Sequence, residues 1–404
     1  MKVVITNAVL SNTGDAAICQ GIREALIAEG VSSSSQITVM DANSEVTSLL
    51  YPEWNVHQQL CYPVPMKNRY VRKIRQQLKI LSVLFLLSNS TLTRKFIDRI
   101  KKIDSSFGRS LAIYADADLV VSSGGTYLVD HYDFRPRELE LRFAAKLGSD
   151  VVLWTQSMGP FLTNRSARSA SRIASVASAV FFRDQRSADS WGKLTEKRLP
   201  GGVCADAAFA LKPHPKPRNS ELKTVIISVR EWNLTSTGRP LGSSQYGTAC
   251  RSAVTAVENH GGTVRALSTC QGVQGYGIDD SITATKLFQD LGIAIDSQHH
   301  TPDDLLDELN QSAGVITTRM HLAILALIAR VPVIAIAYEF KTVELFARLG
   351  LDDYVCRIED VSSEWVTGRV TELMTNPETM MLSPETVSEL REECLHAAIV
   401  AGSL

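Results

Sequence analysis

An arginine and a histidine stand close together in the last third of the chain, at Arg319 and His321. Residues 314–318 form a β-branched, apolar run that predicts a buried strand, and residues 322–329 predict a short apolar helix. The two side chains are therefore expected where a strand opens into a helix. In a parallel α/β sheet this edge binds ligands, and the helix N-terminus favours an anion.

The next strand end adds further polar residues to the same edge. Residues 331–337 predict a second buried strand, and Tyr338, Glu339 and Lys341 follow it. The two strand ends thus gather an arginine, a histidine, a glutamate and a lysine, which suit the binding of an anion and the transfer of a proton. Each residue alone is more simply explained as a structural or surface group. Their combination at the end of an α/β unit favours a functional site.

The N-terminal strand, predicted at residues 2–6, leads into a loop that carries Asn12, Gly14 and Asp15. We expect a helix from residue 16 with Asp15 as its N-cap, and Gly14 would let the backbone approach a ligand closely. A plain capped turn between a strand and a helix also explains these residues.

Strands and helices alternate along the chain, and a polar segment at residues 211–223 interrupts the alternation. This segment contains Pro213, Pro215 and Pro217 and is the best linker in the sequence. The alternation predicts mostly parallel sheets with helices on both faces. We therefore expect an α/β chain of two Rossmann-like domains, residues 1–211 and 212–404, with a cleft between them.

The overall composition narrows the classes of function. The 42 Lys and Arg nearly balance the 43 Asp and Glu, so the net charge of −1 implies no nucleic-acid partner. The 7 cysteines are scattered without a CxxC pair, which argues against a zinc site and fits a reducing cytosol. The N-terminus does not read as a signal peptide, and no apolar run is long enough to span a bilayer. We therefore expect a cytoplasmic protein without a bound metal.

A basic segment at residues 67–102 departs from this balance, because residues 54–97 contain no Asp or Glu. In a helix, one face would carry the apolar side chains Tyr70, Ile74, Leu78, Leu81 and Phe85. Another face would carry the basic side chains Arg72, Arg75 and Lys79. Two interpretations are equally supported. The segment is either a peripheral contact with an anionic membrane surface or a solvated basic face over a helix that packs on the core.

Several short motifs follow one another in an order and spacing that resemble one protein family. They are Asn12-Thr13-Gly14-Asp15, Gly124-Gly125, Gln156-Ser157-Met158-Gly159-Pro160, Arg183-Asp184, Asp206, Ser228 with Arg230, Thr318-Arg319-Met320-His321 and Tyr338 to Lys341. Together they resemble the polysaccharide pyruvyltransferases, which are similar in fold to two-domain GT-B glycosyltransferases. That family transfers a pyruvyl group from phosphoenolpyruvate to two hydroxyls of a sugar in a surface polysaccharide or its lipid-linked precursor, giving a pyruvate ketal.

The resemblance implies roles for residues of the C-terminal half. Arg230 and Arg319 would grip the carboxylate and the phosphate of phosphoenolpyruvate, and His321 would protonate its methylene carbon. Glu339 is one candidate base for the sugar hydroxyls. Lys341 would either contact the phosphate or pair with Glu339. No cofactor is expected besides the donor substrate.

The N-terminal half is expected to hold the sugar or lipid-linked oligosaccharide acceptor. Asp15 is the second candidate base. Further substrate contacts are expected at Asn12, Gly14, Gly124, Gly125, Gln156 and Arg183.

Two other interpretations remain open. A GT-B glycosyltransferase that uses a nucleotide sugar would need the same fold and a basic site of this kind. A non-catalytic partner in polysaccharide assembly would use the basic segment as a docking surface, although the arginines and His321 are retained here. The sequence indicates neither the oligomeric state nor the acceptor sugar.

Overall fold

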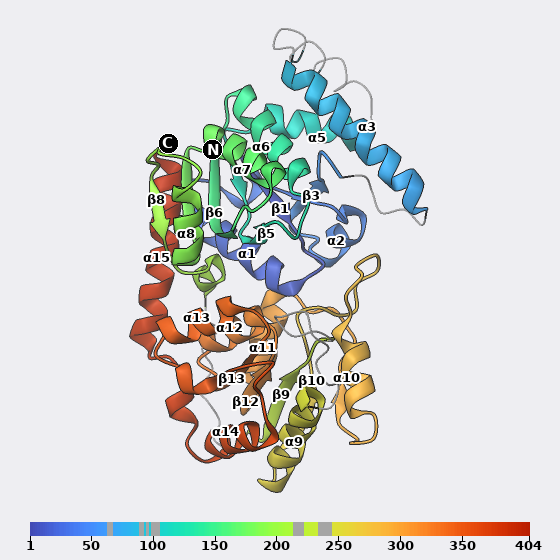
Figure 1. Cartoon of the computed structure of the whole chain (residues 1–404), viewed down its shortest axis with the longest axis vertical. Helices are drawn as coiled ribbons and strands as arrows, with labels where there is room; N and C mark the ends of the chain where they lie inside the picture. The colour runs from blue at the N-terminus through green and yellow to red at the C-terminus, as the bar shows by residue number, and fades with distance from the viewer. Residues whose placement is uncertain (63–67, 89–92, 94–96, 98–105, 213–221, 233–244) are drawn as a thin grey trace. The chain divides into compact units, whose positions relative to one another are not determined.

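The structure of the protein is a computed structural model, which describes residues 1–62, 68–88, 93, 97, 106–212, 222–232 and 245–404 (Figure 1). The expected linker prolines and the basic residues Lys67, Arg94, Lys95, Arg99, Lys101 and Lys102 lie outside this part of the chain. The described chain forms two compact units. The first comprises Met1–Ser11, Ile18–Ala210 and Leu390–Leu404, and the second comprises Asn12–Ala17 and Leu211–Glu389. The break between Ala210 and Leu211 lies one residue from the expected division after residue 211, and the segments Asn12–Ala17 and Leu390–Leu404 belong to the opposite unit from the one that this division gives them.

An eight-stranded parallel sheet forms the centre of the first unit. Its strand order is β3-β2-β1-β4-β6-β7-β8, and β5 pairs with β6 beside this path. The central strands β1 and β4 are buried along their whole length, as expected for a parallel sheet covered by helices. The strands are β1 (Val3–Ala8), β2 (Ile37–Asp41), β3 (Asn55–Gln58), β4 (Leu119–Ser122), β5 (Gly125–Leu128), β6 (Asp150–Met158), β7 (Ala179–Phe182) and β8 (Gly201–Val203).

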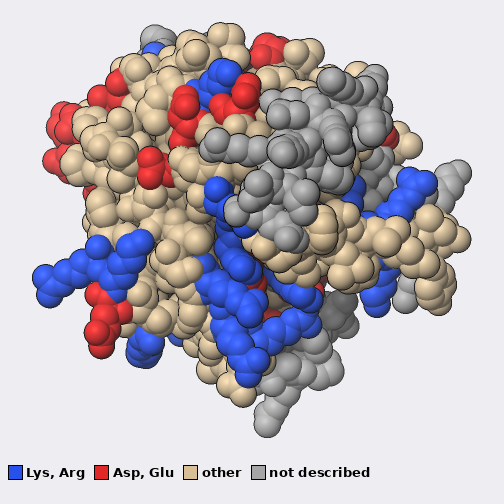
Figure 2. Space-filling view, turned by 90° about the horizontal axis from the view of Figure 1, so that it is seen from above, with Lys and Arg blue, Asp and Glu red and all other residues tan. Residues whose placement is uncertain are grey.

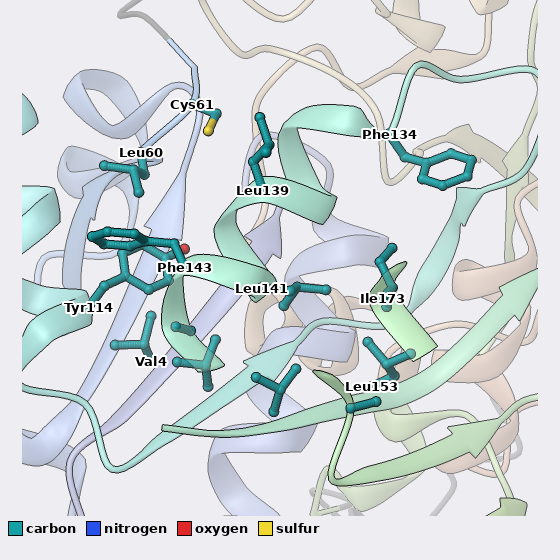
Figure 3. Close-up of a cluster of buried hydrophobic side chains, with 14 of the residues drawn as sticks. Val4, Leu60, Cys61, Tyr114, Phe134, Leu139, Leu141, Phe143, Leu153 and Ile173 are labelled. Atoms are coloured by element: carbon teal, nitrogen blue, oxygen red, sulfur yellow. The ribbon is translucent and has the colours of Figure 1, made fainter. Parts of the chain in front are cut away.

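Helices connect and cover these strands, and their apolar faces form the core of the first unit. Figure 3 shows this core, where Val4 of β1 and Leu153 of β6 lie with Tyr114, Phe143 and Ile173 from three helices. Each large side chain buried in this way stabilises the fold by about 1.5–3 kcal/mol. The helices are α1 (Thr13–Ala28), α2 (Ser44–Leu50), α3 (Arg69–Ser88), α5 (Ser106–Ala115), α6 (Arg135–Leu147), α7 (Asn164–Val176) and α8 (Gln185–Gly192).

A six-stranded parallel sheet forms the centre of the second unit, in the order β11-β10-β9-β12-β13-β14. Its strands are β9 (Thr224–Ser228), β10 (Thr263–Ala266), β11 (Ala294–Ile295), β12 (Gly314–Thr317), β13 (Val333–Ala337) and β14 (Val355–Arg357). The helices are α9 (Gln245–Asn259), α10 (Asp280–Phe288), α11 (Pro302–Asn310), α12 (Met320–Ile328), α13 (Phe340–Arg348) and α14 (Ser363–Thr375), and α15 (Pro384–Gly402) ends the chain. The two parallel sheets confirm the expected α/β class.

The start of α1 differs from the expectation. The helix begins at Thr13, so Asp15 lies in its first turn and the prediction that Asp15 is the N-cap was wrong. Asn12 performs that function, because its Oδ1 accepts a hydrogen bond from the Gly14 amide at 2.9 Å. A negative side chain remains favourable in the first turn, because the helix dipole is positive there.

The helix α3 packs on the first unit through one face. Ile80, Val83 and Leu86 are buried in the core, whereas Leu78 and Leu81 are exposed. The apolar stripe that the sequence predicts on α3 is therefore present, but the core contacts come from other positions of the helix. Among the helices of the described residues, none combines the length and the apolar character needed to cross a bilayer.

Candidate functional site

Three neighbouring strands of the second sheet bring the predicted donor-binding residues to one edge. Arg230 follows β9, Arg319 and His321 follow β12, and Tyr338 and Glu339 follow β13. Because these strands are adjacent and parallel, their carboxyl ends lie side by side. The helices α12 and α13 begin at the same edge, which adds the positive ends of two helix dipoles.

The N-terminal motif reaches this edge through its contact with His321. A Cβ atom on Gly14 would lie 2.7 Å from Cβ and 2.8 Å from Nδ1 of His321, so only glycine fits there without displacing the imidazole. Thr13 anchors the segment. Its amide donates to the carbonyl oxygen of Thr269 at 2.9 Å, and its hydroxyl donates to that of His300 at 2.6 Å. The imidazole of His321 thus rests against the start of α1.

Asp15 and Asn12 lie at the same edge, beside the loop that follows β10. Burial raises the pKa of Cys270 and of Tyr276, and the nearby Asp15 carboxylate adds to the effect at both. A side-chain hydrogen bond joins Tyr276 to Asn12. Asp15 is itself buried, so one of the two candidate bases lies in a water-poor setting close to His321.

Arg319 is held in a buried ion pair. Its Nε donates to Asp280 Oδ2 at 2.7 Å and its Nη2 donates to Oδ1 at 2.6 Å, with the two side chains 9% and 3% exposed. Burial alone would lower the pKa of Arg319, but Cys270 and the hydrogen-bonded Asp280 outweigh it and raise this pKa. The hydroxyl of Ser268 donates to the same carboxylate. This pair occupies two of the three guanidinium nitrogens and leaves Nη1 outside it.

Arg230 has a different environment. Its Cζ lies 3.8 Å from the ring centroid of Tyr338 and 5.5 Å from that of Trp232, and the two ring centroids are 5.4 Å apart. In the described part of the chain no carboxylate pairs with this guanidinium, and its buried Nε has no hydrogen-bond partner. A guanidinium stacked on aromatic rings keeps its N–H groups in plane for a bidentate anion. Arg230 is therefore well placed to receive a carboxylate or a phosphate.

Glu339 and Lys341 form an ion pair at the start of α13. Lys341 Nζ lies 2.7 Å from Glu339 Oε2, and the lysine side chain is the more buried of the two. Glu339 occupies the N-cap position of α13 but makes no side-chain capping hydrogen bond. The pairing of Lys341 with Glu339, one of the two roles expected for Lys341, is thus present in the structure.

In the first unit, the predicted site residues Gly124, Gly125 and Gln156 allow neighbouring strand ends to pack closely. A Cβ atom on Gly124 would lie 2.6 Å from Thr155 Oγ1 of β6, and Gly125 has a φ of 128° and pairs with Gln156. Gln156 is 1% exposed, and its Nε2 donates to the carbonyl oxygen of Ser123 at 2.7 Å. Backbone geometry therefore explains these residue types without a substrate contact.

Arg183 is part of a polar network in the first unit. Its Nη1 donates to Asp206 Oδ2 at 2.6 Å, and its Nε and Nη2 donate to Ser157 Oγ at 3.1 and 3.0 Å. Ser157 in turn donates to Asp184, whose other carboxylate oxygen caps α8 at Ser187. Motif residues from three strand ends are thus connected by hydrogen bonds, which gives them a structural role.

Sequence reasoning did not single out Asp280, Tyr276 or Trp232. Asp280 starts α10, where an acidic residue is expected for helix stability alone. Trp232 stands two residues after Arg230, so the sequence offered a signal for that stacking contact. Within the described ranges, no group of three or more His, Cys, Asp or Glu side chains is arranged to hold a metal ion.

The two parallel sheets give the chain a GT-B-like fold. The chain is similar to HepE of Anabaena in complex with UDP and glucose, with a TM-score of 0.53 and 10% identity over 100% of this chain and 97% of that chain. It is also similar to the UDP-GlcNAc 2-epimerase of Methanocaldococcus jannaschii, with a TM-score of 0.56 and 13% identity over 97% and 99%. At these identities the likeness defines the fold alone.

The chain belongs to the polysaccharide pyruvyl transferase family, whose pattern matches residues 12–339. It is 26% identical over 405 residues to the amylovoran biosynthesis protein AmsJ of Erwinia amylovora, covering 94% of this chain and 93% of that protein. The matched range runs from Asn12, at the start of α1, to Glu339, at the start of α13. The resemblance seen in the sequence motifs is thereby confirmed.

Proposed function

We propose that the protein transfers the pyruvyl group of phosphoenolpyruvate to two hydroxyls of a sugar, forming a pyruvate ketal and releasing phosphate. The observation that carries this proposal is Arg230, an arginine stacked on two aromatic rings that pairs with no carboxylate of the described chain. His321 follows the neighbouring strand. Membership of the pyruvyl transferase family supports the same reaction.

The donor would bind at the carboxyl edge of β9, β12 and β13. Phosphoenolpyruvate carries a carboxylate and a phosphate on a small frame, and a guanidinium can hold either group through two parallel hydrogen bonds. Arg230 would supply such a grip, and the N-termini of α12 and α13 would add backbone N–H donors. Arg319 would contribute Nη1, while its pair with Asp280 keeps the guanidinium in place.

His321 would act as the general acid. Protonation of the methylene carbon turns it into a methyl group and leaves C2 electron-poor. A sugar hydroxyl then forms one C–O bond at C2, the bond from C2 to the phosphate oxygen breaks, and a second hydroxyl closes the ketal. Of the two hydroxyl protons, one replaces the proton that His321 gave and the other leaves with phosphate. Histidine suits this exchange because its pKa normally lies near neutrality.

Asp15 and Glu339 are the candidate bases for the sugar hydroxyls. Asp15 is buried beside the segment that touches His321, whereas Glu339 is bound to Lys341 in a more exposed ion pair. We favour Asp15, because it adjoins Gly14, which packs directly against the imidazole of His321.

The acceptor would be a sugar of an exopolysaccharide or of its lipid-linked precursor. The naming of the relative AmsJ for amylovoran biosynthesis supports this class of acceptor. We propose that acceptor contacts come from the first unit and that the enzyme works in the cytoplasm, at the inner face of the plasma membrane.

Transfer of labelled pyruvate tests this function directly. Phosphoenolpyruvate labelled in its methylene carbon is incubated with the purified protein and with membranes that carry lipid-linked acceptors. The proposal expects acid-labile label in the glycan fraction with wild type and none with His321→Ala. If no label enters the glycan, and a parallel incubation with a labelled nucleotide sugar transfers its sugar instead, the protein is a glycosyltransferase.

A further inference from the structure

We infer that the exposed apolar face of α3 docks the protein onto an anionic lipid surface. The helix carries a row of large apolar side chains at a spacing of three and four residues, which places them on one face. They are 54–71% exposed, which is unusual for side chains of this size, and the row consists of Tyr70, Ile74, Leu78, Leu81 and Phe85.

The core of the first unit does not use this face. The residues of α3 that are buried there are Ile80, Val83 and Leu86, which are at most 5% exposed and lie on another side of the helix. The helix α3 is therefore apolar on two faces, and the described core of the first unit covers only one of them. Figure 1 shows the helix beside α5 and α6.

The basic character of this part of the sequence indicates what binds to the exposed face. Residues 54–97 contain eight Lys and Arg and no Asp or Glu, in a chain whose net charge is −1. On α3 itself, Arg72, Lys73 and Arg75 are exposed. Figure 2 shows Lys and Arg side chains lying together on the face that this view presents. A helix with a row of large apolar residues and flanking basic residues lies in the headgroup region of anionic lipid.

A second copy of the chain is a poorer occupant. A symmetric dimer through this face would bring the same patch of each copy together. Each copy would bring to this contact a segment, residues 54–97, that carries basic side chains and no acidic ones, so the charges would repel rather than pair. An anionic lipid surface offers the opposite charge and an apolar layer at once.

Vesicle flotation of the purified protein tests the inference without any substrate. Wild type is expected to float with vesicles that contain phosphatidylglycerol, to stay unbound with pure phosphatidylcholine, and to lose binding in high salt. A variant with Ile74→Gln, Leu78→Gln and Leu81→Gln should bind at least about tenfold more weakly. A variant with Arg72→Gln, Lys73→Gln and Arg75→Gln should lose roughly fivefold per charge.

Matched controls separate docking from general surface effects. Leu49→Gln with Leu162→Gln changes two leucines that are 78% and 81% exposed elsewhere in the first unit, and it should float as wild type does. All variants change exposed residues and should keep the melting temperature. Wild type that fails to float, or a stripe variant that floats normally, overturns the inference. If wild type is a dimer and the variant with Ile74→Gln, Leu78→Gln and Leu81→Gln is a monomer, the face binds a second copy of the chain instead.

Discussion

At the scale of single residues, three arginines of the family motifs have different partners. Arg183 and Arg319 are bound by buried carboxylates, whereas Arg230 is stacked on Tyr338 and Trp232. An arginine in a buried pair is costly to detach, because its partner would remain as an uncompensated charge. We therefore expect Arg183 to shape its surroundings, Arg319 to offer the donor only its Nη1, and Arg230 to supply the main grip on the donor.

Replacing Arg230 should affect ligand binding more than folding. Arg230→Ala is expected to weaken phosphoenolpyruvate binding about 10- to 100-fold, because charge-assisted hydrogen bonds are lost. The rise in melting temperature with added phosphoenolpyruvate measures this. Arg251→Ala, which removes an exposed ion pair with Asp290, serves as the control and should respond as wild type. An undiminished ligand response in Arg230→Ala would exclude this arginine from the donor site.

Replacing Arg319 should affect folding strongly. Arg319→Ala leaves Asp280 buried without its cation, so the free energy of unfolding is expected to fall by about 3–5 kcal/mol. Arg319→Met combined with Asp280→Leu should cost clearly less, because both charges are removed together. Denaturant unfolding of the two variants decides this. If both variants lose the same free energy of unfolding, the unpaired charge of Asp280 is not the cause of the loss.

At the scale of elements, the start of α1 positions His321. Gly14→Ala would drive a Cβ into the imidazole, and we expect turnover to fall about 10- to 100-fold through the displaced acid. His321→Ala should lose about 10²- to 10⁴-fold in turnover while it keeps donor binding. Rates of phosphate release and calorimetric affinities separate the two effects.

Gly368 in α14 supplies the matched control for Gly14. A Cβ there meets nothing within 4 Å, so Gly368→Ala should leave turnover unchanged and stabilise the helix by about 0.5–1 kcal/mol. Normal turnover in Gly14→Ala would show that His321 tolerates the shift or does not act as the acid.

The segment before α11 should make stability depend on pH. Burial, with the neighbouring His300 adding to it, lowers the pKa of His299 from 6.5 to about 4. The folded state therefore disfavours the proton. The contribution of the neutral His299 to the free energy of unfolding is therefore complete above pH 6.5, and it is lost as the pH falls towards 4. We expect this histidine to account for about 1–2 kcal/mol after solvent screening.

Unfolding of His299→Gln measured across this pH range tests that expectation. The variant should show a flatter dependence than wild type between pH 6.5 and 4. Because the carbonyl of His300 holds Thr13, loss of this contribution should also loosen the start of α1. Parallel pH profiles for the two proteins would refute the assignment.

At the scale of the whole molecule, the sequence was sufficient to predict where the strands end, but it did not predict which side chains pair there. The β-branched runs predicted β9, β12 and β13, and these strands carry Arg230, Arg319 and Tyr338 to one edge because their order in the sheet makes them neighbours. The pairing of Arg319 with Asp280 could not be predicted, because it depends on how the loop before α10 returns to the sheet.

The contact between Gly14 and His321 is a second case. Each residue was singled out from its own strand–helix junction, but no local pattern relates segments so far apart in the sequence. The apolar stripe of α3 is the converse case. Periodicity found the stripe, yet only the packing of Ile80, Val83 and Leu86 distinguishes the face that the core covers from the exposed one.

Calorimetric titration with phosphoenolpyruvate tests the central claim most directly. Wild type and His321→Ala are titrated with phosphoenolpyruvate and with UDP and GDP sugars. If Arg230 binds the donor and His321 acts only as the general acid, both proteins should bind phosphoenolpyruvate saturably and with similar affinity. Neither should bind the nucleotide sugars. Binding of a nucleotide sugar in place of phosphoenolpyruvate would contradict the pyruvyl donor and move the protein to sugar transfer.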